Sequence, residues 1–222
     1  MAKSLFGKNP DLEDIDFIEA VEAAFGVTFD KEPAAWSTFG DVFDAICQRV
    51  QPVERGPFPC LSASAYRRIR RALLKIAPGS NVRPETHLKA LIADRSFSVW
   101  WRELEQESGL KLPLLTLTNW SLLILVAVIF AVPGVVAVSG LPGWIAVLSP
   151  MLGLLASGWL PAKPTVRTVG DLARSAAALN ARQLSQSHAA IRTRDVWDSL
   201  VWIARDITAY PGQIDRGTAL IG

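Results

Sequence analysis

The longest apolar segment of the chain runs from Thr116 to Lys163, and no charged residue occurs between Lys111 and Lys163. A helix that crosses the hydrocarbon core of a bilayer needs about 20 predominantly apolar residues. The segment therefore predicts a transmembrane hairpin over 118–161, with crossings at 120–138 and 144–160 and a turn at 139–143. Its tryptophans near the helix ends, where aromatic rings favour the headgroup level, are Trp120, Trp144 and Trp159. The alternative is a buried hairpin of a soluble core, which rarely needs so long a stretch without a charge.

A hairpin returns the chain to the side of the bilayer on which it began. The flanks hold all the lysines and arginines, and the turn holds none. The positive-inside rule then predicts a two-pass protein of the inner membrane with both termini in the cytoplasm. The first residues, MAKSLFGKNPDLED, contain no apolar core, so we expect no cleaved signal peptide.

The residues before the hairpin alternate between helical patterns and loops. Residues 11–50 predict a compact helical unit, and the prolines and glycine of 51–62 predict a linker. The first helix of the unit at 11–50 is expected to end at Gly26. Thr38 is a candidate N-cap of the second helix of this unit, with Asp41 in its first turn. The apolar stripe expected on the first helix consists of Ile15, Ile18, Val21, Ala24 and Phe25.

A second unit begins with an amphipathic helix at 64–76. Tyr66, Ile69, Leu73 and Ile76 are expected to face inward, and Arg67, Arg68, Arg70, Arg71 and Lys75 outward. Two interpretations of this basic face stay open: contact with anionic lipids, or an ordinary solvated surface. A loop follows at 77–94, then a helix at 96–107 that carries Trp100 and Trp101 and stops at Gly109.

Two further helices are predicted after the hairpin. Thr168 is a candidate N-cap for a helix at 169–179, and residues 180–194 are either a loop or a helix extension. An amphipathic helix at 195–209 turns Val196, Leu200, Ile203 and Ile207 inward, and a loop ends the chain. The predicted fold class is therefore all-α, with small helical bundles beside a transmembrane hairpin.

The composition adds little chemistry to this outline. The 222 residues are 50% hydrophobic and carry a net charge of +2. A small positive charge is expected next to a membrane, so it does not indicate a nucleic-acid partner. Cys47 and Cys60 fit no metal spacing, and a cytoplasmic flank would keep them reduced. His87 and His188 lie on separate loops, outside any metal motif. No metal or resident cofactor is expected.

Short matches within the chain indicate an internal repeat. The segment 38–42, TFGDV, matches 168–172, TVGDL, and 82–88, VRPETHL, matches 214–220, IDRGTAL. The helix end at 21–27, VEAAFGV, matches 104–110, LEQESGL. The order of the matches is the main evidence for a repeat, because each match belongs to one recurring helical plan.

That plan resembles the acyl carrier protein fold. The family has a first helix, a long loop with an Ile-x-x-x-Thr-x-Leu pattern, a second helix ending in Leu-Glu-x-x-Phe-Gly-Ile, and a last helix that starts at Thr-Val-Gly-Asp-Val. The resemblance implies one unit over 11–50 and a second over 63–113 and 165–180, with the hairpin inserted in the second. Residues 195–222 supply the first helix and loop that the N-terminal unit lacks. We therefore expect this C-terminal segment to complete it, as a circular permutation or by exchange between two chains.

The resemblance also implies a site, because the family attaches phosphopantetheine to a serine at the start of its second helix. Alignment on the Leu-Glu and Gly motifs places Asp11 and Asp94 there, and a carboxylate cannot accept the arm. A shifted register places Ser96 or Ser98 at the position instead. The same family helix binds basic patches on partner enzymes, and here its acidic cluster is Glu13, Asp14, Asp16 and Glu19. A favourable interaction with the helix dipole is the other interpretation of that cluster.

Two functional hypotheses follow. The first is a membrane-anchored, non-enzymatic carrier-like protein that docks to a protein partner through the acidic face, with lipid or polyketide pathway enzymes as candidate partners and self-association as an alternative. The second is a genuine membrane-tethered acyl or peptidyl carrier modified at Ser96 or Ser98. A small membrane enzyme is the third class, and the lack of polar catalytic groups in the hairpin disfavours it.

Overall fold

The computed structural model describes residues 5–6, 10–29, 36–54, 59–92, 96–117, 162–187 and 191–220. Within these residues no helix is both long and apolar enough to cross a bilayer. The predicted hairpin, with Trp120, Trp144 and Trp159, lies outside the described residues.

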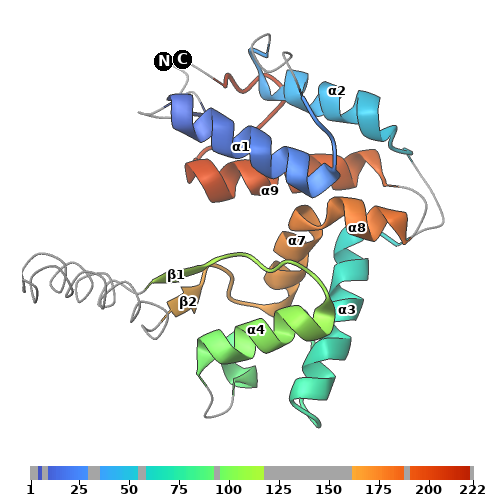
Figure 1. Ribbon diagram of the computed structural model, residues 1–222, viewed down its shortest axis with the longest axis vertical. Coiled ribbons are helices and arrows are strands. Elements are labelled where there is room, and N and C mark those ends of the chain that lie inside the picture. Colours follow the sequence, from blue (N-terminus) through green and yellow to red (C-terminus); the bar gives the residue numbers. More distant parts are fainter. Residues whose placement is uncertain are drawn as a thin grey trace, which may run out of the picture. The chain divides into compact units, whose positions relative to one another are not determined.

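The described part of the chain is all-α apart from one pair of three-residue strands (Figure 1). The all-α prediction is therefore confirmed. In chain order, the elements are α1 (Pro10–Phe25), α2 (Phe39–Val50), α3 (Leu61–Ile76), a 3₁₀ helix η2 (Leu88–Leu91), α4 (Phe97–Ser108), β1 (Leu115–Leu117), β2 (Ala162–Pro164), α7 (Val169–Leu179), α8 (Ala181–Gln186) and α9 (Thr193–Thr208).

The chain divides into two compact units. The smaller contains 92–103 and 114–166, and the larger contains 1–91, 104–113 and 167–222. In the smaller unit β1 and β2 pair antiparallel, with Leu115 opposite Pro164. The rings of Phe97 and Trp101 stack at 5.4 Å, and Trp100 joins the same cluster. These tryptophans therefore contribute to an aromatic core.

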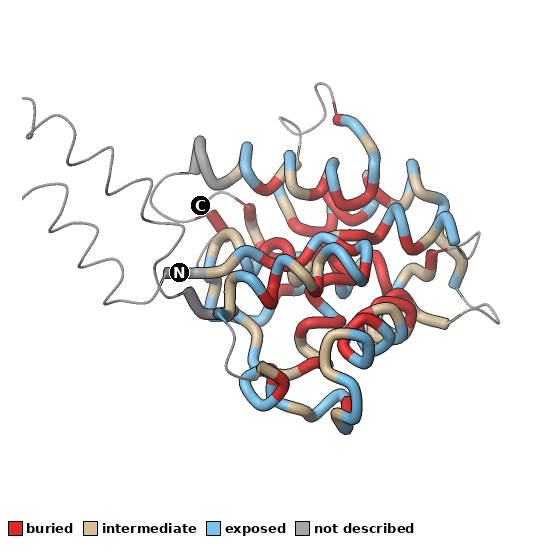
Figure 2. The backbone as a smooth tube through the Cα atoms, turned by 60° about the horizontal axis from the view of Figure 1, so that its bottom comes forward, coloured by how far each residue is buried: buried red, intermediate tan, exposed pale blue. Residues whose placement is uncertain are grey.

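The C-terminal helix α9 forms the centre of the larger unit (Figure 1). It packs on α1, α2 and α7, while α3 packs along α7. The indole of Trp197 meets the rings of Phe39 and Phe43 edge-on, each at 5.3 Å. The C-terminal segment and the N-terminal helices thus share one core, and the buried positions lie where these helices face each other (Figure 2).

The two segments with repeated sequences adopt the same local structure. In one copy, the N–H groups of Phe39 and Gly40 donate to the carbonyls of Thr218 and Arg216, at 2.9 Å each. In the other, Val169 and Gly170 donate to Thr86 and Pro84, at 3.0 and 2.8 Å. The loop that follows the first helix of each copy, 210–220 and 77–88, therefore acts as a strap across the first turn of the last helix. We call these loops the two straps.

The helix ends are also built alike in the two copies. Gly26 and Gly109 terminate α1 and α4 with φ of 65° and 63°. The Glu22 carboxylate accepts from the N–H of Phe29 at 2.5 Å, and Glu105 accepts from Leu112 at 3.3 Å. Both glutamates thus hold the extended chain that leaves the helix, which explains why the glutamate and the glycine recur together in 21–27 and 104–110.

Capping boxes begin α2 and α7, as the threonines predict. The Thr38 hydroxyl accepts from the N–H of Asp41, and Asp41 accepts from Thr38 in return. Hydrogen bonds from the N–H groups of Ser37 and Thr38 lower the pKa of Asp41. Partial burial opposes ionisation of Asp171, but hydrogen bonds from Thr168 and the charge of Arg174 outweigh it and lower its pKa.

The predicted stripe of α1 is partly wrong. Ile15 is 53% exposed, and Ile18 is only half-buried. Val21, Ala24 and Phe25 are buried as predicted, and Phe17 joins them on the buried face, where its ring packs against Phe39 at 6.3 Å. Apolar residues lie on several sides of α1, so spacing alone did not identify the inner one.

Other boundaries differ from the sequence-based ones. The predicted linker 51–62 ends earlier, because α3 begins at Leu61 rather than at residue 64. Residues 181–186, for which a loop or helix extension was expected, form the separate helix α8 after a break at Asn180. The Asn180 side chain bonds the backbone N–H and C=O of Lys111, at 2.9 and 2.8 Å. This link between α7 and the chain after α4 accounts for the break.

We expect Gly40→Ala to destabilise the protein, because an added Cβ would lie 2.8 Å from the Arg216 carbonyl oxygen. The loss should be about 1–3 kcal/mol, lowering the Tm of the full chain by several degrees. Gly170→Ala should behave alike, since its Cβ would lie 3.0 Å from the Pro84 oxygen. Gly217→Ala is the matched control, with its nearest contact at 3.6 Å. Equal Tm values for the Gly40 and Gly217 variants would contradict the close approach.

The capping aspartates predict a component of stability that depends on pH. A carboxyl whose folded pKa is lowered stabilises the fold above its unfolded pKa, about 3.9, and that contribution is lost as pH falls through the folded pKa. Asp171→Asn should therefore lower the Tm at neutral pH, and the difference from wild type should shrink below about pH 4. Glu85→Gln, at an exposed loop position, is the control. A Tm difference that stays constant with pH would argue against a role for the Asp171 charge.

Candidate anion-binding site on the basic helix

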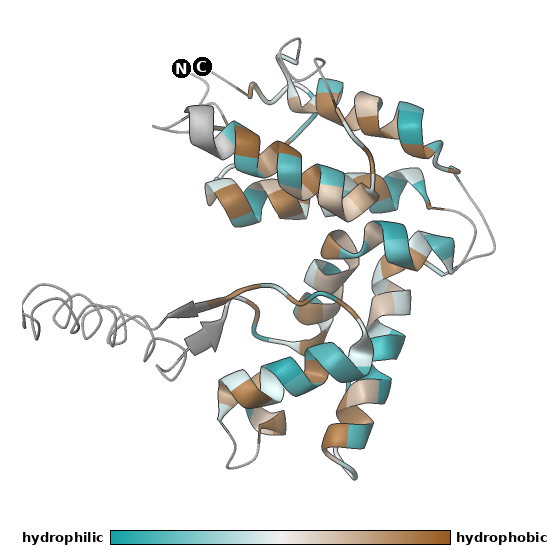
Figure 3. Ribbon diagram, viewed as in Figure 1, coloured by the Kyte–Doolittle hydropathy of each residue, from teal (hydrophilic) through white to brown (hydrophobic). Residues whose placement is uncertain are grey.

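The outer face of α3 carries a cluster of arginines and no acid. Arg67, Arg70 and Arg71 are exposed and lie three and four residues apart, so they share one side of the helix. The opposite side buries Ala65, Ile69, Ala72 and Leu73, and α3 packs there against α7. This division of α3 into a polar and an apolar face is visible in the hydropathy colouring (Figure 3).

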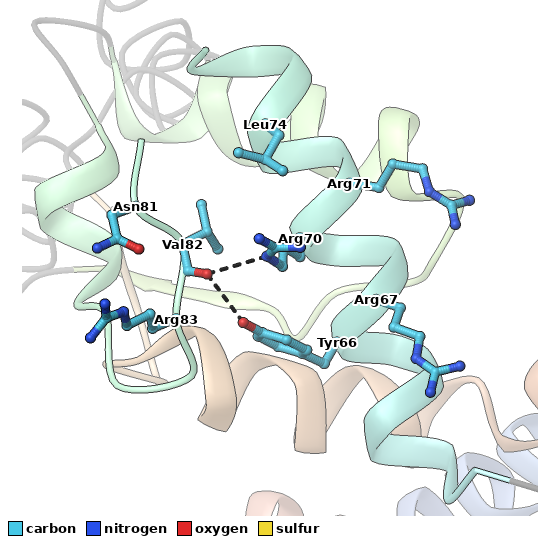
Figure 4. A pocket seen from close by; sticks show the side chains of 8 residues that line it. All are labelled: Tyr66, Arg67, Arg70, Arg71, Leu74, Asn81, Val82 and Arg83. Atoms are coloured by element: carbon cyan, nitrogen blue, oxygen red, sulfur yellow. Dashed lines mark hydrogen bonds between the residues drawn. The ribbon is translucent and has the colours of Figure 1, made fainter. Parts of the chain in front are cut away.

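The loop after α3 returns alongside this basic face. The Tyr66 hydroxyl donates to the Val82 carbonyl at 3.2 Å, and Arg70 Nε donates to the same oxygen at 3.4 Å (Figure 4). Tyr66 was expected to face inward, and it is half-buried. Its hydroxyl instead fastens the loop to the helix. The Val82 side chain is buried, which anchors the loop from the other side.

A concavity of about 540 Å³ lies between α3 and this loop. Figure 4 shows the head of Arg70 directed toward Val82, with Arg67 and Arg71 extending along the outer side of α3 and Arg83 on the loop. The residues that line it are Tyr66, Arg67, Arg70, Arg71, Leu74, Asn81, Val82 and Arg83. The lining thus includes four guanidinium groups and no carboxylate.

Among the described residues, these four arginines have no ion-pair partner. The described pairs join Lys75 to Glu107 at 2.8 Å, Arg174 to Asp171, Arg194 to Asp198 and Arg216 to Asp44. Lys75, one turn after Arg71, pairs with the Glu107 carboxylate but does not line the concavity. The concavity therefore keeps a concentrated positive charge.

The equivalent helix of the other copy shows that the fold does not require these arginines. Burial aligns Ser64 with Asp195, Ala65 with Val196, Ile69 with Leu200, Ala72 with Ile203 and Leu73 with Ala204. This alignment places Asp198, Trp202 and Asp206 on α9 where α3 has Arg67, Arg71 and Lys75. On α9, Arg194 and Asp198 pair at 3.6 Å, one turn apart.

Like charges one turn apart destabilise a helix by about 0.2–0.5 kcal/mol per pair, and Arg67, Arg71 and Lys75 form two such pairs. The basic face thus costs stability that the α9 face does not. A ligand that supplies negative charge would offset the cost. The solvated-face interpretation leaves the clustering unexplained.

The start of the basic helix is held by a residue that the sequence pattern did not single out. Asp195 is 8% exposed and accepts a hydrogen bond from the N–H of Leu61. Burial raises the pKa of Asp195, although this hydrogen bond and the nearby charge of Arg192 oppose the rise. Cys60 at the N-cap of α3 makes no side-chain cap. Asp195, which belongs to α9, therefore caps the start of α3 and links the two copies.

The acidic cluster lies on α1. Asp16 and Glu19 are exposed, and Asp14 is half-buried, with its carboxylate accepting from the N–H of Ile15 at 2.7 Å. The side chain of Glu13 lies outside the described ones. The exposed Ile15 stands in the middle of these acids. We call this surface, made of Asp14, Ile15, Asp16 and Glu19, the acidic face.

Three of the candidate carrier positions lie within the described residues, Asp11, Ser96 and Ser98. Asp11 is in the first turn of α1, with its side chain outside the described ones, and Asp94 is outside the described residues. Ser96 is exposed directly before α4, and its hydroxyl lies 3.0 Å from that of Ser98. The two serines are thus together at the start of α4.

The remaining chemical candidates are Cys47, His87 and His188. Burial raises the pKa of the Cys47 thiol, and the Asp44 charge adds to this, while the Arg216 charge opposes it. A raised pKa disfavours the nucleophilic thiolate. His87 is exposed and forms a backbone bridge with Thr168, while His188 lies outside the described residues. No group of three His, Cys, Asp or Glu in the described part of the chain could hold a metal ion.

The arginines of α3 could be identified from the sequence, but the residues across from them could not. Asn81, Val82 and Arg83 belong to a loop with no helical period, and only the structure brings the loop back onto α3. Comparisons with protein-family models, with curated proteins and with solved structures find no match.

Proposed function

We propose that this protein is a membrane-anchored, non-enzymatic docking module with carrier-like helical units, acting on the cytoplasmic face. The observation that carries the docking role is the exposed isoleucine within the acidic face, Ile15 at 53% exposure. The membrane anchor rests on the charge-free segment between Lys111 and Lys163.

The acidic face has the make-up of a docking surface. Protein interfaces centre on a few apolar anchors, and surrounding polar groups select the partner and exclude water. Ile15 would supply the anchor, and Asp14, Asp16 and Glu19 the charge. The sequence of α1 contains no lysine or arginine, so the partner surface should be basic around an apolar pocket.

The rigidity of α1 supports the same role. Phe17, Val21, Ala24 and Phe25 bury its inner side, where it packs on α9. A helix fixed in this way presents its outer residues with little conformational entropy to lose on binding. The resemblance to carrier proteins, whose second helix contacts partner enzymes, points to this face, with enzymes of lipid or polyketide pathways as candidate partners and a second copy of the chain as the alternative.

Charge reversal on α1 tests the docking role. We expect Asp16→Lys with Glu19→Lys, or Ile15→Ser, to abolish cross-linking of the membrane-embedded protein to its partner at constant expression. The control pair, Glu54→Lys with Glu85→Lys, makes the same charge change at exposed positions elsewhere. If the control loses the cross-linked species equally, or the α1 variants retain it, the acidic face is not the docking surface.

A second candidate function is a genuine carrier, favoured by the exposed Ser96 beside Ser98 at the start of α4. Intact mass after co-expression with a broad phosphopantetheinyl transferase distinguishes the two. The docking proposal predicts no added mass. A gain of one phosphopantetheine arm that disappears in Ser96→Ala or Ser98→Ala would establish the carrier function instead.

A further inference from the structure

We propose that the concavity between α3 and the 81–83 loop binds a phosphate group, either on the headgroup of an anionic lipid or on a soluble phosphate. The site is formed by Arg67, Arg70, Arg71 and Arg83 with Tyr66 and Asn81. It is separate from the acidic face of α1, so its test does not depend on the proposed docking role.

Arg70 is the positioned element of the site. Its Nε donates to the Val82 carbonyl at 3.4 Å, and the Tyr66 hydroxyl donates to the same oxygen at 3.2 Å. The two terminal nitrogens of the Arg70 guanidinium make no hydrogen bond to other described residues, so they can donate to a ligand. A planar guanidinium presents its donors as a fork that matches two phosphate oxygens.

The other donors that line the concavity come from two segments of the chain, and in Figure 4 the side chains of Arg67 and Arg71 extend outward from α3, away from the loop. Arg67 and Arg71 come from the same helix face, and Asn81 and Arg83 come from the loop that Tyr66 fastens (Figure 4). These three arginines are exposed and have no ion-pair partner in the described part of the chain. Four positive charges favour a phosphate, above all a doubly charged monoester, over a single carboxylate.

An apolar edge completes the concavity. Leu74 is 37% exposed and lies one turn beyond Arg70, and the Tyr66 ring is half-buried below it. Basic groups next to apolar surface suit a lipid headgroup whose glycerol and first methylenes leave the charged region. A lipid headgroup would therefore make contacts that a soluble phosphate does not.

The other copy of the repeat provides an internal comparison. At the positions of Arg67, Arg70 and Arg71, the helix α9 has Asp198, Val201 and Trp202. The two helices share their buried positions, so the difference lies in the outward residues. A phosphate site is thus expected on α3 and not on α9, which supplies a matched control.

The test is calorimetric titration of the full chain in a neutral detergent. The probes are inorganic phosphate, short-chain phosphatidic acid and, as controls, short-chain phosphatidylcholine and octanoate. We expect Arg67→Gln with Arg71→Gln to weaken binding of the phosphate probes at least about tenfold, the loss of charge-assisted hydrogen bonds to two arginines. The control pair on α9, Arg194→Gln with Arg205→Gln, should change it less than about twofold.

The outcomes distinguish a lipid headgroup from a soluble phosphate, and they also show whether the proposal fails. Binding of phosphatidic acid with none of phosphate assigns the site to a lipid headgroup, and similar affinity for both assigns it to a soluble phosphate. Equal affinity for octanoate, equal loss in both variant pairs, or no binding of either phosphate probe overturns the proposal. Tm values of the arginine variants at or above that of the wild type show that any loss of affinity is not unfolding.

Discussion

The larger unit depends on one backbone contact that is made twice. In each copy a strap returns across the first turn of the last helix, and its carbonyls accept the N–H groups of the first two helical residues. First-turn N–H groups have no partner within their own helix, so a buried helix start needs acceptors from elsewhere. The contact also requires glycine at residues 40 and 170, where a Cβ would meet a strap carbonyl. In the first copy the strap is the C-terminal loop, which therefore has to return to the N-terminal helices.

This framework constrains the inner faces of the helices and leaves the outer ones free to differ. The helices α3 and α9 bury corresponding residues yet present unlike surfaces, a run of arginines on one and alternating charges with a tryptophan on the other. In the described part of the chain, the outer side of α1 gathers acidic residues and the outer side of α3 gathers basic ones. The proposed docking role uses the first of these surfaces and the proposed phosphate site uses the second.

The helix periods, the glycine stops and the threonine caps could be predicted from sequence, because each depends on neighbouring residues. The repeat could be predicted because the straps and the capping boxes together impose Thr-x-Gly-Asp on both copies. The outward orientation of Ile15 could not be predicted, because α1 has apolar residues on several sides. Only the contacts of α1 with α9 and with Phe39 of α2 select its inner side. The loop half of the basic concavity and the capping of α3 by Asp195 also escaped prediction, because both join segments distant in sequence.

Residue-resolved amide hydrogen exchange of the full chain shows whether equivalent straps close both copies. We expect the amides of Phe39 and Gly40, bonded to the C-terminal strap, to exchange as slowly as those of Val169 and Gly170. Rapid exchange at Phe39 and Gly40 beside slow exchange at Val169 and Gly170 would mean that the C-terminal loop does not close the first copy.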